Sequence, residues 1–276
     1  MRKINYPLIV SDFDGTLVKK DGTIDESNRK AIADYIAAGG AFAISTGRMP
    51  SGILSRAREL GLKGMISCCQ GAVILDVESG KVVSDGRLSF ASTVAACKKM
   101  EEMGLHIHVY DLWNYYCNKD DELLGWYEKA VRSKATLVLD KPISKFVEEK
   151  GLCAYKILAM VAPADNERIL QALAAENFEG CGLTKSDDLL VEVVNARYSK
   201  GTAVRFLAEY YSAPIEKTIA IGDQRNDIPM IEEAGLGIAV KNADNALKDA
   251  ADIVCEYTNE EGAVGKIIEK YGYTEE

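Results

Sequence analysis

Four carboxylates stand where short apolar segments of this sequence end. Asp12 and Asp14 come directly after the apolar run 8–11, and Asp223 and Asp227 follow a similar run near the C-terminal end. If these segments meet, four carboxylates so close together cannot all stay ionised without a cation. Hard oxygen ligands, with few nitrogens or thiolates among them, favour Mg²⁺. The pattern therefore predicts a magnesium site, with Asp227 better suited to indirect contact with the ion.

A carboxylate can also act as a nucleophile and split one difficult displacement into two easier steps. Asp12 fits that role, and Thr46 and Lys200 would neutralise the charge on a phosphoryl group. Asp14, two residues further on with a glycine behind it, can turn towards the leaving oxygen. It would protonate the departing alcohol and then activate a water molecule.

The elements that position these residues alternate along the chain. Apolar runs at 8–11, 41–45 and 218–221 are separated by helical segments. The first of these helices is predicted to start at Asp25, which would be its N-cap residue. Continuous apolar strands between helices predict a parallel sheet that is covered on both faces, as in a Rossmann-like α/β domain. Because ligands bind at the carboxyl ends of such strands, the polar residues should converge there.

The middle of the sequence has a different pattern. His106, His108 and Tyr110 alternate with apolar residues, as in a strand with two unlike faces. This α+β pattern predicts an inserted domain over residues 84–188, between a first core segment at 1–83 and a second at 189–276.

His106 and His108 are the two histidines of the chain and lie on one face of the predicted strand. A third metal ligand is not evident beside them, which favours a structural or substrate-side role over metal binding. The seven cysteines show no CxxC spacing, so free thiols are expected in place of a disulfide framework or a zinc site.

The composition of the sequence limits the kinds of molecule that this protein is expected to bind. The 276 residues carry a formal net charge of −9, which disfavours nucleic acid and anionic membranes as partners. The first ten residues hold only a four-residue apolar run, too short for a signal peptide or a membrane span. We therefore expect a cytoplasmic protein that is a monomer or a homodimer and acts on a small phosphorylated metabolite.

Four segments of the sequence resemble the four motifs of the haloacid dehalogenase superfamily. In chain order they are Asp12-Phe-Asp14-Gly-Thr16, Ser45-Thr46-Gly47-Arg48, Ser199-Lys200-Gly201 and Gly222-Asp223-Gln224-Arg225-Asn226-Asp227. Their order, with the insert between the second and the third, resembles the Cof-type branch with a type-IIB (C2B) cap. The resemblance covers the entire chain.

The resemblance implies a catalytic role for four residues. Asp12 would be the nucleophile and Asp14 the general acid and base, while Thr46 and Lys200 would hold the phosphate. Phosphatases of the family carry the second aspartate, whereas ion-pumping relatives have threonine there, so Asp14 implies hydrolysis of a phosphate ester.

The resemblance also implies a cofactor and its ligands. Mg²⁺ would be bound by Asp12, the backbone carbonyl of Asp14 and Asp223, with Asp227 supporting the metal. Asn226 would support the metal or the phosphate. Gln70 stands where this branch usually has asparagine, which bears on substrate preference more than on chemistry.

Gly47 and Arg48 are candidate substrate-binding residues, although Arg48 could instead reach the cap or form a surface ion pair. The function predicted from the sequence is hydrolysis of small phosphomonoesters, such as sugar phosphates, phosphorylated cofactors or nucleotides. Two alternatives stay open: a phosphomutase, which returns the phosphoryl group to a sugar, and a non-enzymatic sensor of phosphorylated metabolites. Release of free phosphate separates both from a phosphatase.

Overall fold

The computed structural model describes residues 2–187 and 189–274, and the chain divides into two compact units. The first unit holds the residues up to Thr46, then Leu54–Ser84, then the residues from Ser199 onward. The second unit holds Gly47–Ile53 and Asp85–Tyr198. The second is thus an insertion into the first.

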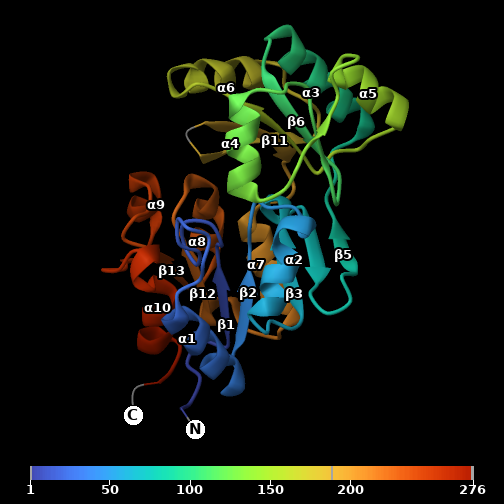
Figure 1. Cartoon of the computed structure of the whole chain (residues 1–276). Helices are drawn as coiled ribbons and strands as arrows, with labels where there is room; N and C mark the ends of the chain where they lie inside the picture. Colours follow the sequence, from blue (N-terminus) through green and yellow to red (C-terminus); the bar gives the residue numbers. More distant parts are fainter. Residues whose placement is uncertain (1, 188, 275–276) are drawn as a thin grey trace. The chain divides into compact units, whose positions relative to one another are not determined.

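A five-stranded parallel sheet forms the centre of the first unit (Figure 1). In spatial order its strands are β14 (Ile253–Val254), β13 (Leu236–Ala239), β12 (Thr218–Gly222), β1 (Leu8–Ser11) and β2 (Ala41–Ile44). Ser11 is in register with Ile44 on one side and Ile221 on the other. The carboxyl ends of β12, β1 and β2 therefore lie side by side, and the loops that follow these strands start from one edge of the sheet.

Helices accompany this sheet, as its buried inner strands β12 and β1 require. They are α1 (Glu26–Ala37), α2 (Pro50–Glu59), α7 (Lys200–Tyr210), α8 (Ile228–Glu233), α9 (Asn245–Ala250) and α10 (Ala263–Tyr271). Helix α1 packs against α10, and α7 packs against α8. Asp25 caps α1 by accepting a hydrogen bond from the backbone N–H of Ser27 at 2.9 Å, so the predicted helix start is confirmed.

A smaller sheet of three strands adjoins β2 in the first unit. It consists of β3 (Met65–Cys68), β4 (Val73–Asp76) and β5 (Val82–Asp85). Strands β3 and β4 are antiparallel, and a parallel bridge between Ser45 and Ser67 joins β3 to the end of β2. The polar turn after β2 is thereby held between two strands.

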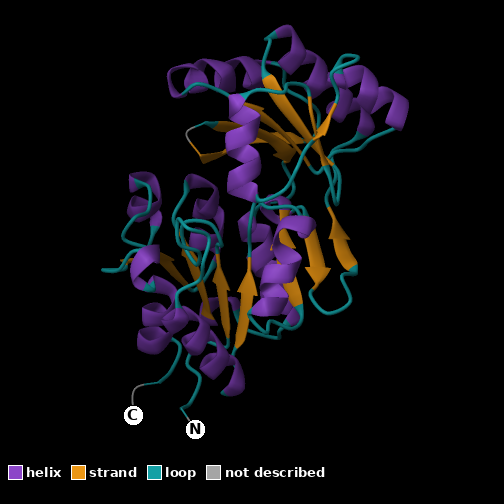
Figure 2. Cartoon of the chain, in the orientation of Figure 1, coloured by secondary structure: helices purple, strands orange, loops and turns teal. Residues whose placement is uncertain are grey.

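The second unit is built on a six-stranded sheet (Figure 2). Its spatial order is β10 (Cys181–Asp187), β11 (Leu190–Asn195), β9 (Lys156–Met160), β6 (His106–Tyr110), β7 (Tyr115–Cys117) and β8 (Thr136–Leu137). Neighbours are antiparallel except β7 and β8. The mixed helices and antiparallel strands agree with the predicted α+β class.

The two faces of this sheet differ in chemistry because side chains alternate along a strand. One face is apolar and packs with α3 (Phe90–Glu102), α5 (Ile143–Lys150) and α6 (Asn166–Ala175). The other face carries His106, His108 and Tyr110 of β6 next to Tyr127 of α4 (Glu122–Val131). The alternation predicted for β6 is confirmed, but its polar side chains are buried rather than half-exposed.

The second boundary of the insert differs from the predicted one. The first break, after Ser84, lies next to the expected position at residue 83, but the second lies after Tyr198 and not after residue 188. The apolar run 190–194 resembles a core strand in sequence, yet as β11 it pairs with β9 and β10. Residues 47–53 also group with the second unit. Within residues 2–187 and 189–274, no helix combines the length and apolarity needed to cross a membrane.

Candidate active site

Asp12 lies at the carboxyl end of β1, which runs between β12 and β2 in the parallel sheet. Its backbone N–H donates to the carbonyl oxygen of Ile221 at 2.8 Å, so the sheet ladder still fixes the backbone at this residue. Its side chain is only 7% exposed. The result is a carboxylate held rigidly at the edge where the loops begin.

Lys200 lies against this carboxylate as the first residue of α7. Ser199 caps the helix, which fixes the point where the lysine leaves the backbone. The Lys200 Nζ donates at 2.5 Å to Oδ1 of Asp12 and at 2.5 Å to Oδ1 of Asp227. Burial alone would lower the pKa of this lysine, but the two carboxylates outweigh burial and raise the pKa, so the ammonium stays charged.

Asp227 is held by both of its carboxylate oxygens. Oδ1 accepts from Lys200, and Oδ2 accepts from the backbone N–H groups of Asp223 and Gln224, each at 2.9 Å. Gly222 is required here because a Cβ on it would lie 2.6 Å from the Cβ of Asp227. Asp227 therefore organises the loop after β12 and positions Lys200.

Asp223 follows β12 and approaches the loop after β1. Its Oδ1 accepts a hydrogen bond from the Thr16 hydroxyl at 2.7 Å. A Cβ on Gly15 would lie 2.4 Å from Oδ2 of Asp223, and Gly15 has a φ of +78°. Glycine at this position thus permits both the backbone conformation and the close approach of the second carboxylate.

Carboxylate oxygens of Asp12, Asp223 and Asp227 lie within 4.8 Å of one another, and all three residues are buried. Burial raises the pKa of Asp12 well above its usual range; the positive charge of Lys200 opposes this rise, and the charges of Asp227 and Asp223 add to it. Burial, then the charge of Asp227, raises the pKa of Asp223 to about 7. A single lysine does not compensate three carboxylates, so this donor set fits a divalent cation with oxygen ligands.

Thr46 and Asp14 occupy different environments. Thr46 follows β2 and is 1% exposed, and its backbone N–H donates to the carbonyl oxygen of Ser67 at 3.0 Å. Asp14 lies two residues after Asp12 and is exposed to solvent. An exposed carboxyl group near a buried nucleophile can exchange protons with water and with a leaving group.

The predicted substrate-binding residues separate into two groups. Asn226 lies in the first unit, where its Nδ2 donates to Oε1 of Gln70 at 3.0 Å. Its Oδ1 is buried and has no hydrogen-bond partner among the described residues, so it can accept a bond from water or substrate. Gly47 and Arg48 belong to the second unit, where Nη1 of Arg48 donates to the carbonyl oxygen of Val131 at 3.2 Å.

Three residues near these carboxylates were not among the predicted site residues. Thr16 holds Asp223, Gln70 holds Asn226, and Asn242 donates from Nδ2 to the carbonyl oxygen of Gly15 at 2.8 Å. Thr16 could have been found because it closes the first motif. Asn242 carries no such signal, since it lies in a loop distant in sequence from the motifs.

Comparison with known proteins agrees with this arrangement. The family described as haloacid dehalogenase-like hydrolase matches residues 9–268. The chain belongs to this family. A relative from Haemophilus influenzae is 30% identical over 268 residues, covering 96% of this chain and 98% of that protein.

Two further comparisons place this hydrolase among phosphatases with the same fold. The 5-amino-6-(5-phospho-D-ribitylamino)uracil phosphatase YwtE of Bacillus subtilis is 27% identical over 281 residues, covering 95% of this chain and 96% of the relative. The crystal structure of a haloacid dehalogenase-like hydrolase from Bacteroides thetaiotaomicron has a TM-score of 0.83 at 26% identity, covering 96% and 99% of the two chains. The hydrolase is an enzyme that acts as a phosphatase.

Proposed function

We propose that this phosphatase hydrolyses small phosphomonoesters with Asp12 as the nucleophile and with Mg²⁺ as its cofactor. The observation that carries the proposal is the buried ion pair of Asp12 with Lys200, at the carboxyl end of β1. It provides a nucleophile and a fixed positive charge within one hydrogen bond of each other.

The residues suited to hold Mg²⁺ are Asp12, Asp223 and the backbone carbonyl of Asp14. Asp227 would support them indirectly, because its two oxygens are already engaged by Lys200 and by backbone N–H groups. When bound, the cation would neutralise negative charge on the phosphoryl oxygens.

In the first step, a carboxylate oxygen of Asp12 would attack phosphorus while the bond from phosphorus to the ester oxygen breaks. Asp14, in its protonated form, would give its proton to the departing alkoxide, which leaves as an alcohol. Lys200 and Thr46 would hold the phosphoryl oxygens during this transfer. The product of the step is an aspartyl-phosphate on Asp12.

In the second step, Asp14 would accept a proton from water as the water oxygen attacks the phosphorus of the aspartyl-phosphate. The bond between phosphorus and the Asp12 oxygen then breaks. Inorganic phosphate leaves and both carboxyl groups return to their starting states. The oxygen gained by phosphate comes from water, so the overall reaction is hydrolysis.

The substrate class is proposed from two sources. An inserted unit of Asp85–Tyr198 gives the chain a second domain that can select a leaving group. The relative named for 5-amino-6-(5-phospho-D-ribitylamino)uracil acts on a small phosphorylated metabolite, by its name. We therefore include that compound, sugar phosphates, phosphorylated cofactors and nucleotides among the candidate substrates.

To test this proposal, the release of inorganic phosphate from each candidate substrate is measured in the presence of Mg²⁺ for the wild type and for Asp12→Asn. Asparagine keeps the shape of the side chain but is a far poorer nucleophile, so we expect a loss of at least roughly 10³-fold. Chelation with EDTA should abolish the wild-type activity and added Mg²⁺ should restore it. Equal activity of the two proteins would refute the role of Asp12, and full activity after chelation would refute the metal requirement.

A further inference from the structure

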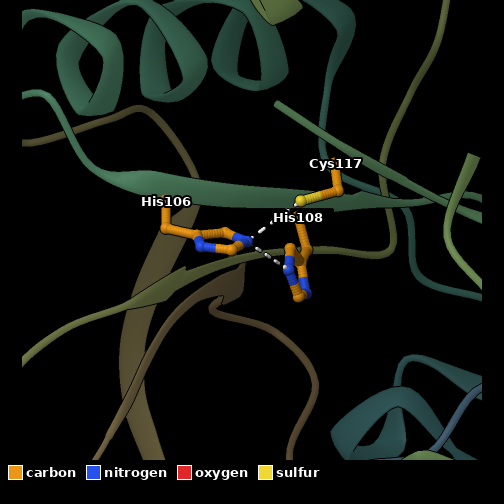
Figure 3. A group of neighbouring side chains, drawn as sticks. All are labelled: His106, His108 and Cys117. Carbon is orange, nitrogen blue, oxygen red and sulfur yellow. Dashed lines mark hydrogen bonds between the residues drawn. The ribbon is translucent and has the colours of Figure 1, made fainter. Parts of the chain in front are cut away.

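A second group of metal-ligating side chains lies in the inserted unit, separate from the carboxylates of the first unit. His106 and His108 project from one face of β6, and Cys117 projects from the adjacent strand β7 (Figure 3). Nε2 of His106 lies 3.0 Å from Sγ of Cys117 and 3.1 Å from Nε2 of His108. The cysteine supplies the third ligand that is not evident from the sequence.

We propose that His106, His108 and Cys117 form a binding site for a borderline-soft transition-metal ion, with Zn²⁺ as the expected occupant. Imidazole and thiolate are the ligands that such ions prefer, in contrast to the oxygen ligands that suit Mg²⁺. The proposal concerns a different site from that of the phosphatase reaction and does not depend on it.

The distances suit a tetrahedral ion after a small adjustment. With metal–ligand bonds of about 2.0–2.3 Å, tetrahedral ligand atoms lie roughly 3.3–3.6 Å apart. The two measured separations, 3.0 and 3.1 Å, are a few tenths of an ångström shorter. All three ligand atoms lie within 4.8 Å of one another, and all three residues are buried. The site is therefore largely formed before a metal enters.

Proton placement in this cluster gives an independent reason to expect a cation. Nδ1 of His106 lies 3.2 Å from Oδ2 of Asp121, which favours a proton on Nδ1. Nε2 of His106 then has one lone pair but two neighbours within hydrogen-bond distance. With the proton on Nε2 instead, a lone pair on Nδ1 would face the carboxylate. Because the Cys117 thiol donates to Lys119, the first tautomer leaves the 3.0 Å contact between Nε2 of His106 and Sγ without a proton, so neither neutral tautomer satisfies every contact.

A second proton on His106 would not resolve this, because the single Nε2–H would still face two neighbours and the charged ring would lie in a buried site. A metal ion at the two Nε2 atoms and Sγ would let Nδ1–H of His106 donate to Asp121. A carboxylate behind a metal-bound histidine is a frequent arrangement in metalloproteins.

The remaining surroundings define how the ion would be held and reached. The thiol of Cys117 donates to the carbonyl oxygen of Lys119 at 3.1 Å, and metal binding would release that proton. Water or this carbonyl oxygen would complete the tetrahedron. Tyr115 and Tyr127 pack beside the His108 ring and limit its movement. Asp121 is 40% exposed, so it marks the entry route from solvent.

The test is titration of the metal-stripped full chain with Zn²⁺ by calorimetry, and with Co²⁺ by absorption spectroscopy in the presence of Mg²⁺. We expect one Zn²⁺ site and a thiolate-to-cobalt charge-transfer band, which carboxylates of the first unit cannot produce. Cys117→Ser should abolish the band and weaken Zn²⁺ binding by at least roughly 100-fold, more than loss of a supporting residue. Cys153→Ser, in the same unit, should leave both unchanged.

A second variant separates metal binding from folding. Asp121 also caps α4, accepting from the N–H of Leu124 at 3.0 Å, and asparagine caps helices equally well. Asp121→Asn should therefore keep the helix and the cobalt band while weakening Zn²⁺ binding about 10- to 100-fold. No cobalt–thiolate band in the wild type, or a band that persists in Cys117→Ser, would overturn the proposal.

Discussion

The two units of this phosphatase bury polar groups in different ways. In the first unit the carboxylates lie at the ends of parallel strands, where loops begin; Oδ2 of Asp227 accepts two backbone N–H groups there. In the second unit the polar groups lie on one face of a mostly antiparallel sheet and contact one another. His106 contacts Cys117, and Tyr110 shares a 2.5 Å hydrogen bond with Tyr127.

This difference explains why one site is visible in the sequence and the other is not. Loops at strand ends hold consecutive residues near each other, so their polar groups appear as short motifs. A site on the face of a sheet is assembled by cross-strand register, which places Cys117 opposite His108. The spacing of residues along the chain does not predict this pairing between strands.

Each unit also contains a buried lysine paired with a carboxylate. Replacing each lysine in turn tests whether the pair in the first unit serves catalysis and the pair in the second unit serves stability alone. Lys200→Met should lower the free energy of unfolding by about 3–5 kcal/mol, because Asp12 and Asp227 lose their buried partner. It should also reduce kcat/KM by roughly 10²–10³, since a phosphate-holding charge is lost. Urea unfolding and phosphate release measure the two effects.

The matched control is Lys156→Met in the second unit. Lys156 donates to Glu192 at 2.9 Å, and both side chains are buried. We expect a similar loss of stability, about 3–5 kcal/mol, but a much smaller change in the rate per folded molecule. Equal losses of kcat/KM in the two variants would contradict the distinction between the two pairs.

Gly15→Ala tests whether close approach of the strand-end loops matters. The added methyl group would collide with Oδ2 of Asp223 at 2.4 Å, and the φ of +78° would cost about 1–2 kcal/mol in any residue with a side chain. We expect a loss of that size in unfolding free energy and a higher Mg²⁺ requirement. Gly61→Ala, with a φ of +71° and nothing within 4 Å of its Cβ, controls for backbone strain alone. An unchanged Mg²⁺ requirement in Gly15→Ala would show that Asp223 need not lie so close.

The smallest effect concerns an aspartate that caps a helix in the first unit. A hydrogen bond from Lys19, with further bonds from Ser27, lowers the pKa of Asp25 to about 2. The folded-state pKa is thus below the unfolded value of 3.8, so the stabilisation is present above 3.8 and is lost as the pH falls towards 2. Asp25→Asn keeps the cap and should cost about 0.5–1 kcal/mol at neutral pH.

Urea unfolding of wild type and Asp25→Asn across the acid range measures this effect. The two stabilities should converge as the pH approaches the folded-state pKa of Asp25. A difference that persists unchanged at low pH would mean that the charge of Asp25 is not its cause. Asp121, which caps α4 in the second unit, provides the contrasting case because its carboxylate also faces His106.

Much of the first unit could be predicted from the sequence because its signals are local. The apolar run at 8–11, the cap at Asp25 and the order of the four motifs gave the α/β class and the grouping of Asp12 with Lys200. The end of the insert was placed at residue 188 instead of Tyr198 because an apolar run does not reveal its pairing partner. The hydrogen bonds from Thr16 to Asp223 and from Asn242 to Gly15 join segments that are far apart in the sequence. The hydrophobic periodicity of the sequence does not predict such contacts.

The central claim is that Asp12 carries the phosphoryl group during hydrolysis. It is tested most directly by mixing the Asp14→Asn variant with Mg²⁺ and an aryl phosphate, whose leaving group departs without needing a proton from Asp14. The reaction is quenched rapidly and the phosphorylated peptide is mapped by mass spectrometry. Because this variant lacks the base that activates water, we predict that an aspartyl-phosphate accumulates on Asp12. Asp12→Asn treated in the same way should carry none. If the wild type turns over substrate but no phosphoryl group is found on Asp12 of the Asp14→Asn variant, the account is contradicted.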